Sequence, residues 1–217
     1  MYTARVLPPS PSRESSAVMS QAPALTTDPL PLWLRVLVRV DFVVAVAGTV
    51  IAPLVLLAGA LRAARKAELV ALLRYWRASS LLMVTVYLLI GERRLAFPAG
   101  VAARLLIART LRGEQTNADP NSWYEPWRRL VGGYCLAGAA LTTPMLQGLI
   151  ADELPLLCRA YIEPTQVFAA LLHPGVPRET LGRVGLVGLG LFLAGAAAAQ
   201  LAWARSPSLK SGRPALE

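Results

Sequence analysis

Two charged residues stand where charge is unusual in this sequence, and they are the first candidates for chemistry. Asp41 follows Arg39 at the start of one long apolar stretch, and Arg104 interrupts another. Ionisable side chains inside a membrane are costly, and they often mark proton paths, ion ligands or substrate routes. Both residues also have a structural interpretation, which we favour. Asp41 would pair with a neighbouring arginine at the membrane interface, and Arg104 would pair with Asp41, Glu92 or a lipid phosphate, or extend toward the headgroups.

No known catalytic motif accompanies these two residues. The sequence has no Walker A loop, no dinucleotide-binding glycine fingerprint, no nucleophile elbow and no paired-histidine metal motif. One histidine and two cysteines exclude a disulfide scaffold and a Cys/His zinc module built from this chain alone. We therefore expect no catalytic residue, no cofactor and no metal site, and a protein that is not an enzyme.

The composition indicates an integral membrane protein. Of the 217 residues, 55% are hydrophobic and only 16% are charged, compared with about 25% charged in an average soluble domain. The 22 Lys and Arg residues outnumber the 13 Asp and Glu residues, which gives a net charge of +9. Because the positive charges follow the ends of apolar stretches and belong to no groove-reading motif, we expect the lipid bilayer and other membrane subunits as partners, and no nucleic acid.

Apolar stretches of membrane-spanning length must position these residues. A helix rises about 1.5 Å per residue, so about 20 apolar residues cross the roughly 30 Å of hydrocarbon. Three stretches reach this length without a charge, and two others would cross if their arginines extend to the headgroups. The sequence predicts an all-α polytopic bundle within residues 35–205, with five spans at about 42–61, 72–91, 95–111, 130–151 and 184–204.

The segment 95–111 decides the topology. If it crosses, the distribution of positive residues places the N-terminus outside. If it re-enters or lies on the surface, four spans remain and the N-terminus is inside. Outside the bundle we predict a disordered Pro/Ser-rich tail over 1–34 and a polar tail over 206–217. One or two short amphipathic helices are expected within 152–181.

Two further patterns are candidates for contact surfaces. A basic, aromatic-edged stretch could bind anionic lipids or an acidic partner, or could simply mark the cytoplasmic side; it comprises Arg62, Arg65, Lys66, Arg74, Trp76 and Arg77. A stripe of small residues in the last span allows close helix packing, inside the bundle or against a partner. The stripe consists of Gly190, Ala194, Ala198 and Ala202.

Several segments of the chain resemble a family of cyanobacterial membrane proteins of unknown function. They are RVDFVVAV (39–46), the stretch 53–92 with its distinctive LLRYWRASSLL, ARLLI (103–107) and LCRAYIEP (157–164). The resemblance covers about residues 35–204 and implies the thylakoid or plasma membrane of an oxygenic photosynthetic bacterium. It implies no activity and no site residues.

These observations lead to two hypotheses about function. In the first, the protein is a non-catalytic accessory, assembly or stabilising factor for a membrane complex, which the lineage suggests is photosynthetic. In the second, it is a small transporter or channel-like protein in which Asp41 and Arg104 line a polar path.

Overall fold

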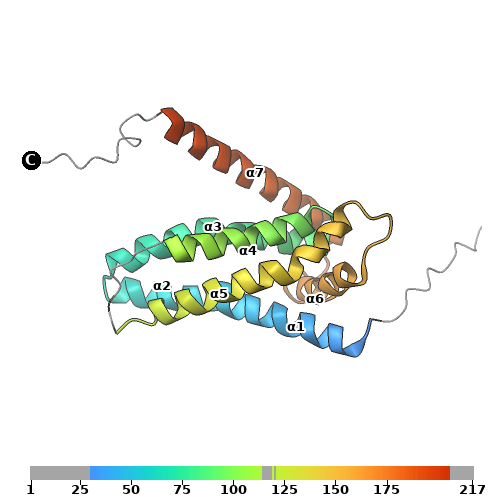
Figure 1. The fold of residues 1–217 in the computed structure, drawn as a ribbon, viewed down its shortest axis with the longest axis horizontal. Helices are drawn as coiled ribbons and strands as arrows, with labels where there is room; N and C mark the ends of the chain where they lie inside the picture. Colours follow the sequence, from blue (N-terminus) through green and yellow to red (C-terminus); the bar gives the residue numbers. More distant parts are fainter. Residues whose placement is uncertain (1–29, 114–118, 120, 206–217) are drawn as a thin grey trace, which may run out of the picture.

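The structure is a computed structural model that describes residues 30–113, 119 and 121–205. Within these ranges all regular structure is helical, which confirms the predicted all-α class (Figure 1). The elements are α1 (Leu32–Val46), the π-helical η2 (Ala47–Ile51), α2 (Ala52–Arg62), α3 (Lys66–Ile90), α4 (Ala96–Gly113), α5 (Tyr124–Thr142), the 3-10 helix η3 (Thr143–Leu149), α6 (Leu156–Leu172) and α7 (Arg178–Arg205).

Three helical stretches are long and apolar enough to cross a membrane: Leu32–Arg62, Lys66–Ile90 and Arg178–Ala202. They contain most of the predicted spans 42–61, 72–91 and 184–204, but the first helix begins ten residues before the predicted boundary. Its N-cap is Pro31, and Arg35 and Arg39, which lie before the predicted span, pair with Glu163 of α6.

The predicted tails need a correction at one boundary. Residues 32–34, assigned to the N-terminal tail, belong to α1. Residues 1–29 of the predicted disordered tail and the predicted polar tail over 206–217 lie outside the described residues.

The two other predicted spans are not among the described helices that are long and apolar enough to cross a membrane. The segment 95–111 corresponds to α4, whose 18 residues include Arg104. The segment 130–151 is not one helix: α5 begins at Tyr124, and the chain becomes a 3-10 helix at Thr143. Pro144 explains the change, because it has no N–H to donate to the carbonyl of Ala140, and the N–H of Thr143 bonds that carbonyl instead. Between α5 and α7 the structure has one short helix, α6, within the predicted 152–181 segment.

Pro53 shapes the helix that contains Asp41. In η2 the N–H of Ala52 bonds to the carbonyl of Ala47, five residues earlier. Pro53 has no N–H, so it can donate neither to the carbonyl of Gly48, five residues earlier, nor to that of Thr49, four residues earlier.

Two aromatic side chains from other helices satisfy these carbonyls. Trp127 Nε1 of α5 donates to the carbonyl of Gly48 (2.8 Å), and the hydroxyl of Tyr75 of α3 donates to that of Thr49 (2.6 Å). The Tyr75 and Trp127 rings also contact each other edge-on, with centroids 5.0 Å apart, within a core cluster shared by α3, α4 and α5.

The connections between helices gather at two ends of the bundle. At one, called the basic end, Arg65 pairs with Asp119 (3.2 Å), which joins the α2–α3 turn to the α4–α5 connection. At the other, called the α6 end, Arg94 donates to the carbonyls of Ala151 and Asp152. The combined helix α1–η2–α2, α4 and α7 therefore run toward the basic end, whereas α3 and α5 run away from it (Figure 1).

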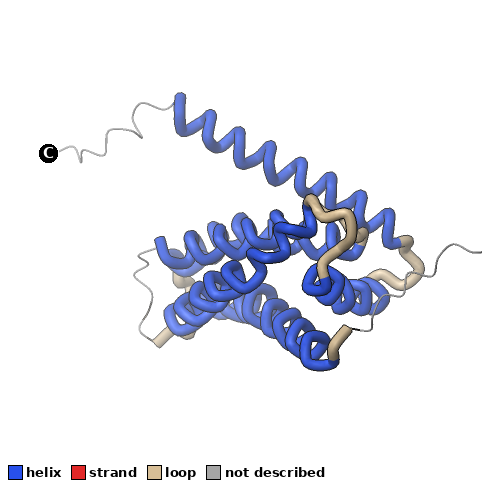
Figure 2. The backbone as a smooth tube through the Cα atoms, turned by 45° about the vertical axis from the view of Figure 1, so that its right-hand side comes forward, coloured by secondary structure: helices blue, strands red, loops and turns tan. Residues whose placement is uncertain are grey.

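Helix α7 is the element that belongs least to the bundle. It packs against α3 near its start and then leaves the other helices toward its C-terminal end (Figures 1 and 2). Only 6% of its most apolar 18-residue window is buried. Most of its apolar surface is therefore left for lipid or for another protein.

Candidate functional site

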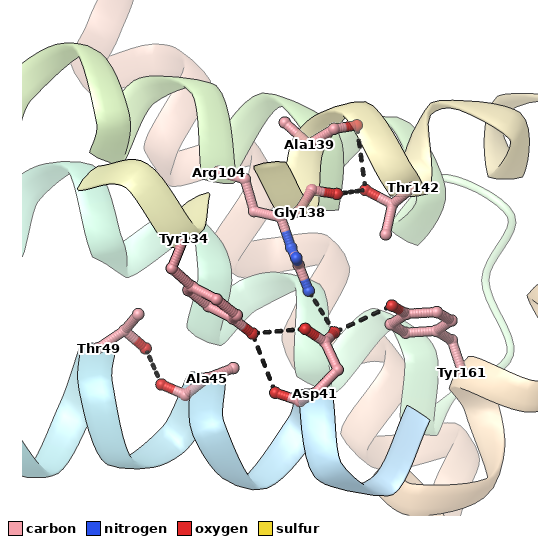
Figure 3. Close-up of polar contacts among 9 residues, drawn as sticks. All are labelled: Asp41, Ala45, Thr49, Arg104, Tyr134, Gly138, Ala139, Thr142 and Tyr161. Atoms are coloured by element: carbon pink, nitrogen blue, oxygen red, sulfur yellow. Dashed lines mark hydrogen bonds and ion pairs between the residues drawn. The ribbon is translucent and has the colours of Figure 1, made fainter. Parts of the chain in front are cut away.

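The carboxylate of Asp41 accepts hydrogen bonds from three side chains that come from three other helices (Figure 3). Arg104 Nη2 of α4 lies 2.6 Å from Oδ2, and the hydroxyl of Tyr161 of α6 donates to the same oxygen at 2.9 Å. The hydroxyl of Tyr134 of α5 lies 2.6 Å from Oδ1. Asp41 therefore links α1, α4, α5 and α6 through one charged group.

The negative charge of Asp41 compensates the buried positive charge of Arg104. Arg104 is only 8% exposed, and a buried charge without a partner is strongly destabilising. Asp41 neutralises it, and the two tyrosine hydroxyls donate further hydrogen bonds to the carboxylate. The guanidinium carbon of Arg104 also lies 5.6 Å from the ring centroid of Tyr134, within the range of a cation–π contact. The arrangement can therefore hold four helices together at low electrostatic cost.

Gly138 of α5 makes room for the guanidinium. A β-carbon on Gly138 would coincide with Nη1 of Arg104. This nitrogen is buried and has no hydrogen-bond partner among the described residues. The packing of α5 thus fixes the position of Arg104 by contact, while Asp41 fixes it by charge.

A small cavity of about 90 Å³ adjoins the pair between α1, α3, α4 and α6. Its threonine hydroxyls donate to carbonyls of their own helices, as Thr85 does to Leu81 (2.8 Å) and Thr165 to Ile162 (2.8 Å). The rest of the lining is mostly hydrocarbon, including Phe42 of α1. Space of this size and character fits a small apolar group.

Of the ion pairs considered for Asp41 and Arg104, the structure contains the one between these two residues. Arg104 pairs with Asp41, which was one of the alternatives for it. Asp41 does not pair with a neighbouring arginine as expected, since Arg35 and Arg39 both bind Glu163 (3.2 and 2.5 Å).

Sequence reasoning missed Tyr134, Tyr161 and Glu163. Each is a polar side chain in a largely apolar helix, and that signal could have identified them as partners for the three arginines and Asp41.

The predicted basic stretch divides into two parts. Arg62, Arg65 and Lys66 surround the α2–α3 turn at the basic end. Arg74 and Arg77 lie exposed on α3, and Trp76 is partly buried against the core cluster.

Glu68, which interrupts this stretch, is the residue whose role the sequence did not indicate. It is 1% exposed and accepts a hydrogen bond from the hydroxyl of Ser122 (2.9 Å). It therefore anchors the α4–α5 connection to α3.

The small-residue stripe does not pack inside the described bundle. All four of its residues are exposed: Gly190, Ala194, Ala198 and Ala202. Helix α7 instead contacts α3 through an earlier set of glycines, in which Gly182 meets Gly91, Gly185 meets Leu88 and Gly188 meets Val84. The stripe has a regular spacing, but the closest approach between α7 and α3 is at Gly182 and Gly91, where glycine meets glycine.

Comparisons with known proteins give a family but no activity. A family model described as "Protein of unknown function (DUF3177)" matches residues 35–215. No curated protein matches the chain, and no solved structure matches it. Among the described residues, no group of three or more His, Cys, Asp or Glu side chains could hold a metal ion.

Proposed function

The chain belongs to the DUF3177 family of unknown function, and from that premise we propose that it is a non-catalytic integral membrane protein that docks onto another membrane protein and helps to assemble or stabilise it. The observation that carries this proposal is the exposed small-residue face of α7. The Asp41–Arg104 pair would hold the bundle that presents this helix.

The geometry of α7 supports a docking role. At 3.6 residues per turn, the stripe from Gly190 to Ala202 lies about 160° around the helix from the glycines that meet α3. Lipid tails are as apolar as leucine, so a lipid-facing surface gains nothing from small residues. A second helix does gain, because glycine and alanine let two backbones approach closely. A transmembrane helix of a partner therefore suits this face better than lipid.

The proposal includes five crossings of the membrane. The combined helix Leu32–Arg62, α3, α4, α5 and α7 run alternately between the two ends of the bundle. The 18 residues of α4 correspond to about 27 Å, close to the hydrocarbon thickness. The apolar part of α5 begins at Leu130 and continues through η3 as far as Leu149. Neutralisation of Arg104 by Asp41 lowers the cost of placing α4 in the membrane.

The orientation of the protein in the membrane follows from the distribution of its positive charges. More Lys and Arg residues lie at the basic end than at the α6 end. The positive-inside rule then places the basic end in the cytoplasm and the N-terminus outside. Given the resemblance to cyanobacterial proteins, we propose a thylakoid or plasma membrane and a photosynthetic complex as the partner.

Co-purification tests the docking proposal. The full chain, extracted in mild detergent from its native membrane, is expected to carry a stoichiometric membrane-protein partner. The double variant Ala194→Leu, Ala198→Leu should lose this partner and keep its own unfolding temperature, because both positions are exposed. Ala199→Leu is the matched control: it is also exposed, but it is turned about 100° from Ala198. A wild-type chain that purifies alone, or equal loss in the control, would refute the proposal.

A transporter is the second candidate, favoured by the cavity beside Asp41 and Arg104. In liposomes a transporter would show solute flux through the wild-type protein, whereas the docking role predicts none. The three donors to Asp41 and the apolar lining make the docking role the better supported of the two.

A further inference from the structure

A wedge-shaped groove opens where α7 leaves the bundle. Near its start α7 is held against α3 by the contact of Gly182 with Gly91, and farther along it separates (Figure 2). The groove between α3, α4 and α7 has a volume of about 510 Å³. Its lining comprises Arg74, Arg77, Ala78, Ser80, Leu106, Thr110, Leu191, Phe192, Gly195 and Ala196.

The polarity of the groove changes along its length. Arg74, Arg77 and Thr110 lie toward the basic end, because α3 starts there and α4 ends there. Leu106 lies one turn deeper on α4, and Leu191 lies about one turn deeper than Gly195 on α7. The groove is thus basic at its outer end and apolar at its inner end.

The depth of Arg77 gives a second reason to expect an anionic ligand. Residue 77 lies 14 positions from Gly91 at the α6 end, which is about 21 Å along the helix. In the proposed five-span arrangement, with Gly91 at one surface of a hydrocarbon layer of about 30 Å, Arg77 lies about 9 Å below the opposite surface. A guanidinium at that depth extends outward toward the headgroups, and its exposed side chain lines the groove.

We propose that this groove binds one anionic membrane phospholipid. Its phosphate would accept hydrogen bonds from Arg74 and Arg77, whose planar guanidinium groups suit phosphate oxygens. An acyl chain would lie along Leu106, Leu191 and Phe192. The described lining holds two arginines and no carboxylate, so an anionic headgroup is favoured over a zwitterionic one.

The shape of the groove favours a lipid over a helix. Helix α7 lies against α3 at Gly182 and diverges from it toward the basic end. A flexible acyl chain and its headgroup can follow a space between diverging helices, whereas a helix packs at a nearly constant distance along its length. The lipid would also hold α7 at its angle to the bundle, an effect that does not depend on any protein partner.

Native mass spectrometry of the full chain in detergent tests this proposal. We expect the wild type to retain phosphatidylglycerol in preference to phosphatidylcholine. The double variant Arg74→Gln, Arg77→Gln should lose about fivefold in relative retention for each arginine removed. Arg109→Gln is the control, because Arg109 is exposed near the same end but does not line the groove. It should stay within about twofold of the wild type.

A second variant separates the apolar contact from the charge. Ala196→Leu fills the groove without changing any charge, and it should also reduce phosphatidylglycerol retention. The proposal is overturned if the wild type retains both lipids equally, or if Arg109→Gln loses as much as the double variant. It is also overturned if inorganic phosphate competes as well as the lipid does, which would indicate a headgroup-only anion site, or if Ala196→Leu instead removes a bound protein. Because purified chain is used, failure of the partner proposal leaves this test intact.

Discussion

Gly138 of α5 lies directly against the guanidinium of Arg104 of α4, where no β-carbon can fit. The missing side chain lets the arginine pass beside α5 and reach Asp41 on α1. The guanidinium of Arg104 is thus held both by packing against Gly138 and by its ion pair with Asp41.

Gly138→Ala should displace Arg104 and destabilise the protein. Overpacking of this kind costs about 1 to 3 kcal/mol, which thermal unfolding in detergent would show as a lower transition temperature. Gly133→Ala is the matched control on the same helix, since nothing lies within 4 Å of a β-carbon there. It should be neutral or slightly stabilising. Equal effects of the two changes would mean that the Arg104 contact is unimportant.

Asp41 and Arg104 should be strongly coupled. Asp41→Asn or Arg104→Gln alone leaves a buried charge without its partner and should cost about 3 to 5 kcal/mol. The double variant should cost clearly less than the sum, because no charge remains unpaired. A double-mutant cycle on unfolding free energies in mixed micelles measures the coupling. Additive effects would contradict the ion pair.

Tyr75→Phe should destabilise the first helix at its π-helical segment. It leaves the carbonyl of Thr49 without a donor, at a cost of about 1 to 3 kcal/mol. Adding Pro53→Ala restores a backbone N–H that can bond to this carbonyl, so the double variant should recover part of the loss. Without any recovery, the carbonyl could not be the source of the destabilisation.

Glu125, outside the apolar stretch that begins at Leu130, should give a small pH dependence. Hydrogen bonds from Arg128, and with it from Arg129, lower the pKa of the Glu125 carboxyl below its ordinary value. A lowered folded-state pKa gives stability that is present above the unfolded-state pKa and is lost as the pH falls through the folded-state pKa.

For exposed pairs on one helix the effect is a few tenths of a kcal/mol. Glu125→Gln removes the titrating carboxyl. The unfolding free energy of this variant should therefore fall less between neutral and acidic pH than that of the wild type, by this amount. An unchanged pH profile would show that these pairs contribute nothing.

The helical class and the position of three membrane-length stretches could be predicted from the sequence, because lack of charge over 20 residues is a local property. The pairing of Asp41 with Arg104 could be proposed as one of several alternatives. Choosing among them needed the tertiary arrangement, since the donors Tyr134 and Tyr161 lie 93 and 120 residues from Asp41.

The packing face of α7 was not predictable by the rule applied. Regular spacing identified Gly190 and Ala194, but α7 comes closest to α3 at Gly182, where the residue it meets on the α3 side is also a glycine, Gly91. A local pattern on one helix contains no information about its neighbour. Pro53, within the predicted span 42–61, indicates an irregular helix, which hydropathy alone does not reveal.

The π-helical segment before Pro53 also has a consequence for biogenesis. The donors that complete it are Tyr75, 26 residues after Thr49, and Trp127, 79 residues after Gly48. The first helix is synthesised long before α5. Until then, the carbonyls of Gly48 and Thr49 lack these two donors, and only water or the translocation machinery can solvate them. The residence of the first helix at the edge of the bilayer should therefore last until the fourth long helix has been synthesised.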